Sequence, residues 1–453
     1  MNAKNGAMNI TKDMMKIRIG VISLGCAKNL VNTEQMMFLL SESGFEVSGE
    51  TEGADIVLLN TCGFIDSAKS EAIETLIELG SMKEDGRIGK IVVAGCLPER
   101  YKDEIMTELP EIDAIVGTGA FDNIVSVVTS LTEDGEKVAL FGDLNSRVSE
   151  AGRIITTSPA WAYLKIAEGC DNCCAYCVIP VIRGRFRSRP QENIIDEAGK
   201  LAAQGVRELI IIAQDVTMYG LDIYGERRLT DLLNALCAIE GLDWIRLHYL
   251  YPDDIDDKLI DLIAKYGKIL KYLDIPVQHI NDGILEKMNR RGSGRDIRAL
   301  FRRLRERIPG VVLRTSIITG LPGEGEDEFE ELCEFLLEEK IERAGVFAYS
   351  PEEGSAAAQM DRPDADIAAH RAQLLMDLQS HIMDDFDLTR VGSVVTVLIE
   401  GKHDDGAYFG RSFAESPDVD GYIIVRGTGI AVNEFAEVRI TAASDGVLTG
   451  VKI

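Results

Sequence analysis

The sequence lacks any apolar run of about 18 residues, the length at which a membrane-spanning helix becomes plausible. It also lacks a signal peptide: residues 1–15 have no apolar core and no cleavage pattern, and we expect a loose tail there. Coiled-coil repeats and low-complexity tracts are absent as well. We therefore expect a cytoplasmic protein with no membrane contact, in which thiols stay reduced. In that compartment the nine cysteines favour metal binding or catalysis over disulfides.

Positive charge is scarce, since 48 Lys and Arg face 75 Asp and Glu, for a net charge of −27. Such a surface repels nucleic acid phosphates and favours basic partners. The same balance also keeps many proteins soluble without any partner, and both explanations stay open. The 453 residues, 46% of them hydrophobic, suit a globular chain of two or three domains.

Three segments near the N-terminus share one layout, in which a short β-branched apolar run leads into a cysteine and then a helical stretch. The runs cover residues 16–25, 55–61 and 90–95, and the cysteines are Cys26, Cys62 and Cys96. The alternation predicts a parallel sheet with crossover helices over residues 16–150. Because the carboxyl ends of parallel strands share one edge, these thiols can converge. As separate thiols they would be ordinary core residues, but the shared pattern favours an iron–sulfur cluster with one open iron.

A second βα series occupies residues 156–385. Its strand candidates are residues 163–167, 208–213, 244–249, 272–276, 311–318 and 344–349. Six units are too few for a closed eight-stranded barrel, so we expect an open (β/α)6 barrel with ligands at the strand carboxyl ends. After a helical linker at residues 374–391, the alternating short strands of residues 390–453 predict a small antiparallel β-barrel. The fold class is thus α/β with a C-terminal β-barrel.

The most specific motif is the C-x3-C-x2-C run of Cys170, Cys174 and Cys177. Three thiolates this close can bind three irons of a 4Fe–4S cube and leave the fourth open to a substrate. A structural zinc site is the competing interpretation, but zinc normally needs four ligands. No histidine lies nearby in the sequence, and Cys173, adjacent to Cys174, would point elsewhere. The spacing therefore favours the cluster.

This triplet and its surroundings resemble the radical S-adenosylmethionine (SAM) superfamily. The resemblance implies that the open iron binds SAM, whose one-electron cleavage yields a 5′-deoxyadenosyl radical. Residues 318–324, Ile-Thr-Gly-Leu-Pro-Gly-Glu, resemble the family's glycine-containing strand end beside the adenosine, which implies SAM contacts at Gly320 and Pro322. The same segment could be a plain turn. Gln214 and Gln278 also end strands, and each could contact SAM or only cap its strand.

The motifs around Cys26, Cys62 and Cys96 resemble the methylthiotransferases, which are radical SAM enzymes. The resemblance implies a second 4Fe–4S cluster held by these three cysteines, a C-terminal TRAM barrel and the use of two SAM molecules and a sulfur donor. It covers nearly the whole chain beyond the tail. An electron donor such as flavodoxin or ferredoxin is expected.

Two branches of this family compete, one modifying tRNA adenosines and the other an aspartate of small-subunit ribosomal protein twelve. Segments similar to the ribosomal-protein branch are residues 27–30, 62–68, 165–171 and 349–354, with Ala27 standing where proline is expected. Residues 391–453 contain nine acidic and five basic side chains, which suits a basic protein substrate and makes tRNA the weaker alternative. The arginine-rich loop of residues 183–189 could bind an anion or only pair with acidic neighbours, and its individual roles stay open.

Overall fold

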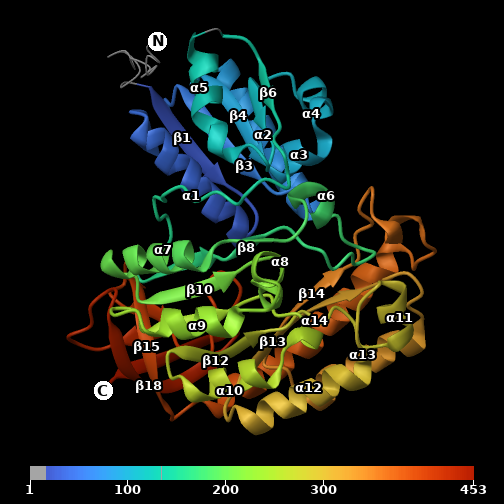
Figure 1. Cartoon of the computed structure of the whole chain (residues 1–453). Coiled ribbons are helices and arrows are strands. Elements are labelled where there is room, and N and C mark those ends of the chain that lie inside the picture. Colours follow the sequence, from blue (N-terminus) through green and yellow to red (C-terminus); the bar gives the residue numbers. More distant parts are fainter. Residues whose placement is uncertain (1–16, 134) are drawn as a thin grey trace. The chain divides into compact units, whose positions relative to one another are not determined.

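The computed structural model describes residues 17–133 and 135–453, so the expected tail at residues 1–15 lies outside it. The chain forms two compact units (Figure 1). The first extends to Thr156 and also includes Val178–Arg185, and the second comprises Thr157–Cys177 and Phe186–Ile453. Among the described residues, no helix has both the length and the apolarity needed to cross a membrane.

The first unit is built on a six-stranded parallel sheet in the order β2-β1-β3-β4-β5-β6. Its strands are β1 (Arg18–Ser23), β2 (Glu46–Ser48), β3 (Ile56–Thr61), β4 (Lys90–Gly95), β5 (Ala114–Val116) and β6 (Val138–Leu140). Its helices are α1 (Ala27–Glu42), α2 (Asp66–Glu84), α3 (Cys96–Tyr101), α4 (Asp103–Glu108), α5 (Ile124–Glu133) and α6 (Ile179–Arg183), with a 3-10 turn η2 (Phe121–Asn123).

Helices cover both faces of this sheet. Met36 and Leu40 of α1 and Val128 of α5 pack on one face, whereas Leu76 and Leu79 of α2 pack on the other. All six residues of β3 are buried, as a central parallel strand covered on both sides requires. From β1 the chain adds β2 on one side and β3 on the other, so the strand order reverses between β1 and β3. In such sheets ligands usually bind in the crevice at the carboxyl ends of the two strands that flank the reversal.

The second unit contains a six-stranded parallel sheet in the order β14-β13-β12-β11-β10-β7, which is open as predicted. Its strands are β7 (Trp161–Lys165), β10 (Glu208–Ile212), β11 (Trp244–Leu247), β12 (Ile269–Asp274), β13 (Val312–Thr319) and β14 (Arg343–Ala348). A short antiparallel ribbon joins β8 (Ala167–Glu168) to β9 (Arg187–Ser188).

Helices alternate with these strands along the chain. They are α7 (Gln191–Ala203), α8 (Leu221–Tyr224), α9 (Leu229–Cys237), α10 (Asp257–Lys265), α11 (Asp282–Lys287), α12 (Gly294–Arg307), α13 (Glu326–Glu339) and α14 (Ala365–Thr389), with 3-10 turns η3 (Val216–Met218), η4 (Pro252–Asp254) and η5 (Ala356–Gln359). The predicted linker at residues 374–391 forms the second half of the longer α14.

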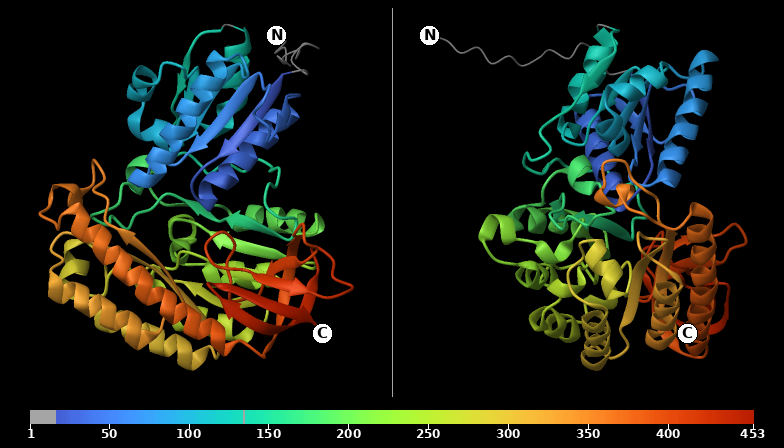
Figure 2. Two further views of the ribbon diagram at one scale, coloured as in Figure 1. Left: turned by 180° about the vertical axis from the view of Figure 1, so that it is seen from behind. Right: turned by 90° about the vertical axis from the view of Figure 1, so that its right-hand side faces the viewer.

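The C-terminal segment forms a closed barrel in the order β15-β16-β17-β19-β18, and it lies on the opposite side of the open sheet from α9 and α10 (Figure 2). Its strands are β15 (Val394–Lys402), β16 (Tyr408–Arg411), β17 (Ile423–Arg426), β18 (Phe435–Ser444) and β19 (Val447–Lys452). The barrel predicted from the sequence is present, but it is not wholly antiparallel, because β17 and β19 pair in parallel. β17 and β19 are separated in the chain by β18, and the alternation of polar and apolar residues within a strand does not indicate which strands pair.

The connection between β16 and β17 fastens this barrel to the open sheet. Arg246 of β11 donates to the carbonyl oxygens of Phe413 (2.8 Å) and Ser412 (3.3 Å). Tyr272 of β12 donates to Asp420 (2.6 Å). Segment 411–417 is largely buried, so the barrel and the half-barrel share an interior rather than only touching at their surfaces.

Candidate active site

The three N-terminal cysteines come together at one edge of the first unit's sheet, as predicted. Cys26 follows β1 and is the N-cap of α1, Cys62 follows β3, and Cys96 begins α3 directly after β4. A Cβ atom built on Gly25 would lie 2.7 Å from Cβ of Cys62, and one built on Gly63 would lie 3.0 Å from the carbonyl carbon of Cys96. The bare glycines therefore let the three ends approach closely.

Electrostatics distinguish the three thiols. Burial opposes ionisation of Cys26, but the positive charges of Lys28 and Arg183 outweigh it and lower the pKa of that thiol. Burial, and then the neighbouring Cys96 and Cys26, raise the pKa of Cys62 to about 12. The mutual effect of the three groups shows that they lie within electrostatic range of one another, and a bound cation would remove the penalty on Cys62.

Asn29 and Arg183 surround this group of cysteines. Asn29 is fully buried and donates to the carbonyl oxygens of Leu24 (3.1 Å) and Thr61 (2.9 Å), which ties the ends of β1 and β3 together. Arg183 donates to Sγ of Cys96 at 3.3 Å. The roles of Arg183 and Asn29 could not be predicted from the sequence. The position of Asn29, one turn into the helix that Cys26 caps, was the available signal for it.

The second triplet lies in the loop after β8, in the second unit. The backbone N–H of Cys177 donates to the carbonyl oxygen of Cys174 (3.0 Å), so these two residues form a turn. The N–H of Asn172 donates to Sγ of Cys170 at 3.5 Å. Burial raises the pKa of Cys170 to about 11, with additional contributions from the negative charges of Asp215 and Cys174. The loop therefore gathers the three thiols that the spacing predicted.

The remaining cysteines lie elsewhere. Cys173 is exposed in a left-handed conformation (φ 52°), and its carbonyl oxygen accepts a hydrogen bond from Asn289 (2.9 Å). Cys237 ends α9 and Cys333 lies in α13. Each site thus has three thiols, the donor set of a cube with one open iron.

Arg290 is a neighbour of the second triplet that sequence reasoning missed. It donates to Tyr176 Oη (3.0 Å) and to the carbonyl oxygen of Pro276 (2.7 Å), and it contacts Sγ of Cys174 at 3.8 Å. It lies 116 residues from Cys174 in the sequence, and no local pattern links the two. Arg290 therefore links the loop of the second triplet to the segment after β12.

The four predicted SAM contacts all lie after the carboxyl ends of strands in the second unit. Gln214 donates a hydrogen bond to Glu168 (2.8 Å). Gln278 forms an isolated parallel β-bridge with Ile317, and its own backbone φ is 70°. Gly320 and Pro322 form the turn after β13. A pocket of about 300 Å³ adjoins Gly320 and is lined by Tyr349, Asp361 and Arg362, among others, but not by the other three predicted contacts.

Packing inside the second unit also requires glycine at position 320. A Cβ there would collide with Cβ of Ala368 in α14, and φ is +80°. The close approach visible in the structure is thus to a helix. Glu324, which sequence reasoning left without a role, holds the turn by accepting from Gly320 N–H (2.9 Å) and Thr319 Oγ1 (2.8 Å). Burial raises the pKa of Glu324, but His279 and these donors more than offset it, and the net pKa is below the ordinary value.

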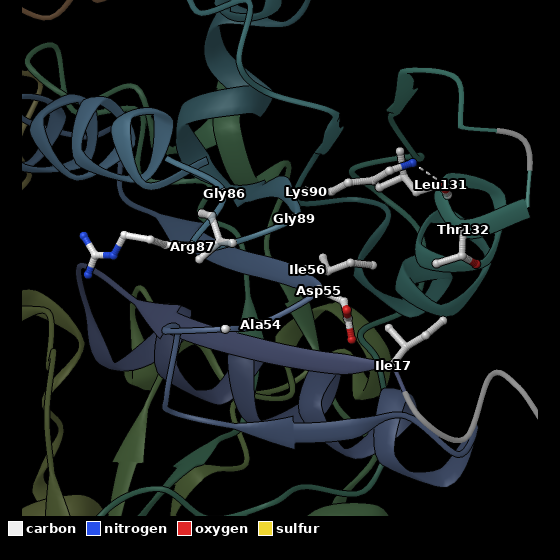
Figure 3. Close-up of a pocket in the computed structure, with 12 residues that line it drawn as sticks. Ile17, Ala54, Asp55, Ile56, Gly86, Arg87, Gly89, Lys90, Leu131 and Thr132 are labelled. Atoms are coloured by element: carbon white, nitrogen blue, oxygen red, sulfur yellow. Dashed lines mark hydrogen bonds between the residues drawn. The ribbon is translucent and has the colours of Figure 1, made fainter. Parts of the chain in front are cut away.

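A larger pocket of the first unit lies at the amino-terminal edge of the sheet, opposite the carboxyl-terminal edge where the cysteines lie. Figure 3 shows Ile17, Ile56 and Lys90 around it, and these residues stand at the amino-terminal ends of β1, β3 and β4. Lys90 donates to the carbonyl oxygen of Leu131, and Asp55 accepts from the Arg18 N–H (2.8 Å). Lys90 and Asp55 of this pocket are thus hydrogen-bonded to backbone groups and stabilise the fold.

Comparison with known proteins identifies the modules. Residues 164–336 match the radical SAM superfamily, residues 391–453 match the TRAM domain, and residues 18–117 match the family described as uncharacterized protein family UPF0004. The ribosomal protein uS12 methylthiotransferase RimO of Pelotomaculum thermopropionicum is 48% identical over 442 residues, which cover 96% of this chain and 99% of that protein. The enzyme of the same name from Acetivibrio thermocellus is 44% identical over 447 residues, covering 96% and 98%.

The chain belongs to the RimO family of uS12 methylthiotransferases. The family resemblance read from the cysteine motifs is therefore confirmed. Solved structures agree on the fold: the radical SAM methyltransferase TsrM from Kitasatospora setae superimposes with a TM-score of 0.54 at 16% identity, covering 73% of this chain and 72% of that one. The cobalamin-dependent radical SAM enzyme OxsB gives 0.51 at 13% identity, covering 80% and 56%.

The donor sets fit the 4Fe–4S cluster that the radical SAM superfamily implies. Among the described residues, no group of three His, Cys, Asp or Glu side chains closes on a single metal ion. In a cube each thiolate binds a different iron, so thiolates stand further apart than around one tetrahedral ion. Each triplet has gathered, partly buried thiols with an arginine within 3.8 Å of one of them, which suits a multinuclear cluster.

Proposed function

We propose that this protein methylthiolates the β-carbon of an aspartate residue in ribosomal protein uS12, using two SAM molecules and a sulfur donor. The observation that carries the proposal is the identity of 43–48% over nearly the full length to proteins named uS12 methylthiotransferase. The excess of acidic side chains in residues 391–453 gives weaker support for a basic protein substrate over tRNA. A ribosomal protein substrate supports the expectation that the reaction takes place in the cytoplasm.

We propose that Cys170, Cys174 and Cys177 hold the radical SAM cluster, and that Cys26, Cys62 and Cys96 hold a second 4Fe–4S cluster. When bound, a reduced cluster and SAM supply the one-electron chemistry that an unactivated C–H bond requires, because no general base can deprotonate it at neutral pH. The protein's part is to hold the thiolates and to keep the site dry. Asn172 N–H donates to Sγ of Cys170 and Arg290 contacts Sγ of Cys174, which helps to hold these two side chains in place.

SAM contacts are proposed at Gln214, Gln278, Gly320 and Pro322. All four follow carboxyl ends of strands in the second unit, where ligands of βα barrels bind. The Gln214 Oε1 atom is buried without a hydrogen-bond partner in the structure, so it can accept from a ligand hydroxyl or amine. We also propose the division into domains at residues 16–150, 156–385 and 390–453, with flavodoxin or ferredoxin as reductant.

The test is methylthiolation by anaerobically reconstituted, reduced protein, followed by mass spectrometry of uS12 and of adenosine-containing tRNA. We expect one methylthio group on an aspartate of uS12 and none on tRNA. Modification of tRNA alone would refute the proposed substrate.

Cysteine variants separate the two sites. Cys170→Ala should abolish SAM cleavage to 5′-deoxyadenosine, and Cys26→Ala should lower the iron content from about eight per chain and abolish methylthiolation. The matched control is Cys237→Ala, a thiol that ends α9 away from both triplets. Full iron content and full methylthiolation in Cys26→Ala would remove the second cluster from these residues.

A further inference from the structure

Arg183 belongs by sequence to the loop that follows the radical SAM triplet, but it packs in the first unit. It ends the short helix α6, six residues after Cys177, and segment Val178–Arg185 groups with the first unit. Its side chain is 3% exposed. Val178 and Ile182 pack with Cys96, which anchors α6 beside the N-terminal cysteines.

The guanidinium of Arg183 is held in one orientation by two asparagines one turn apart on α1. Nη1 donates to Oδ1 of Asn32 at 2.8 Å, and Nη2 donates to Oδ1 of Asn29. Phe121 packs with its ring centroid 6.0 Å from the guanidinium carbon. Because the guanidinium is planar, these contacts fix where its remaining N–H groups point.

From that orientation Nη2 also donates to Sγ of Cys96 at 3.3 Å. Sγ of Cys96 in turn lies 3.7 Å from Oδ1 of Asn29, as a thiol donor would. A metal-bound Cys96 is a thiolate and has no proton to donate, so its contact with Asn29 is lost and the charged N–H of Arg183 becomes its hydrogen-bond partner.

We infer that Arg183 is a positioning residue of the second cluster, which donates a charge-assisted hydrogen bond to the Cys96 thiolate and raises the cluster's reduction potential. This inference rests on the proposed function, since it requires that second cluster. Hydrogen bonds to cluster sulfurs and nearby charge set the potentials of iron–sulfur centres. Reduction adds negative charge, and a buried cation at 3.3 Å stabilises the reduced form more than the oxidised one.

The experiment isolates the second cluster in the full-length chain. In a Cys170→Ala, Cys174→Ala, Cys177→Ala background we would measure iron per chain and titrate the cluster potentiometrically, with detection by electron paramagnetic resonance. Arg183→Met removes the charge and every donor, and Arg183→Gln removes the charge but keeps an amide donor. The matched control is Arg185→Met, an exposed arginine of the same segment.

With Arg183 intact we expect about four irons per chain. Both neutral variants should bind the cluster, and the equilibrium constant for its reduction should fall at least tenfold. For a one-electron step this lowers the midpoint potential by about 59 mV. The potential of Arg185→Met should match that of the parent. An unchanged potential in a neutral variant that keeps its iron would overturn the inference while leaving the proposed function intact. Absence of iron from the background with native Arg183 would overturn both.

If both neutral variants lose their iron, Arg183→Lys distinguishes a need for positive charge from a purely structural role of Arg183. A positive charge at this position should restore iron binding. If the lysine variant folds, as judged by circular dichroism, but still loses iron, Arg183 serves only to fasten α6 and the inference fails.

Discussion

Glu208 should be among the least replaceable acidic residues of the second unit, because it joins the half-barrel to the C-terminal barrel. It is fully buried in β10, and its two carboxylate oxygens accept from Arg246 (2.7 Å) and from Arg411 of β16 (2.8 Å). Burial opposes its ionisation, but the two arginines outweigh that effect and lower the pKa of Glu208. Glu208→Gln would keep the shape and leave two buried arginines facing a neutral amide.

Breaking a buried ion pair by removing one partner costs about 3–5 kcal/mol, because a desolvated charge stays behind. The free energy of unfolding of the second unit should fall by that amount. Replacing Glu208, Arg246 and Arg411 with apolar residues, as Glu208→Leu, Arg246→Met and Arg411→Met, should cost less, because the only partner left unpaired is Glu400, whose side chain is 11% exposed.

The two tryptophans provide the assay, since both lie where the barrels meet. Arg411 stacks 5.7 Å from the ring of Trp161, and Trp244 packs edge to face on Phe435 of β18 at 4.8 Å. Urea unfolding followed by tryptophan fluorescence therefore reports on this junction. The control is Glu240→Gln, an exposed carboxylate of the same unit. A difference of less than about 1 kcal/mol between the two variants, the value of a surface pair, would refute the reasoning.

Three further predictions concern other buried contacts. Burial raises the pKa of Glu415, but Arg390 and Arg343 lower it to about 2. The contribution of Glu415 to stability is therefore complete above pH 4.5, the ordinary pKa of a glutamate, and is lost as the pH falls through 2. Glu415→Gln should flatten the pH dependence of thermal unfolding between these two values. Gly320→Ala should destabilise the second unit by about 1–3 kcal/mol more than Gly310→Ala, which has a similar φ of +76° but nothing within 4 Å of its Cβ. Asn29→Ala should cost about 1–3 kcal/mol for each carbonyl left unbonded and lower iron retention, measured by calorimetry and iron assay.

Much of the fold could be predicted because its information is local. The buried run Ile-Val-Leu-Leu-Asn-Thr of β3 and the glutamate-rich helix of α13 carry their own patterns, and the cysteine spacings mark strand ends. Pairing between distant segments carries no such pattern. The parallel closure of β17 on β19, and the return of α6 to the first unit between two segments of the second, depend on tertiary packing.

Site residues divide in the same way. Cysteines could be predicted because thiols at strand ends are chemically distinctive, whereas Arg290 and Asn29 act through geometry that the sequence does not encode locally. Gly320 shows a different difficulty. A glycine at a strand end indicates a close approach, but it does not name the group that approaches. Ala368 of α14 does so at Gly320, and the SAM contact there stays a prediction.

The charge of the C-terminal barrel illustrates how composition and structure must be combined. Of the charged residues in 391–453, Glu415, Asp418 and Asp420 bond to residues outside this segment, and Glu400 pairs with the buried Arg411. The remaining side chains, five acidic and four basic, leave only a small negative excess for a substrate to meet. Part of the acidity that suggested a basic partner therefore serves to fasten the barrel to the half-barrel. Binding of a basic protein to this barrel should accordingly weaken only mildly as the salt concentration rises.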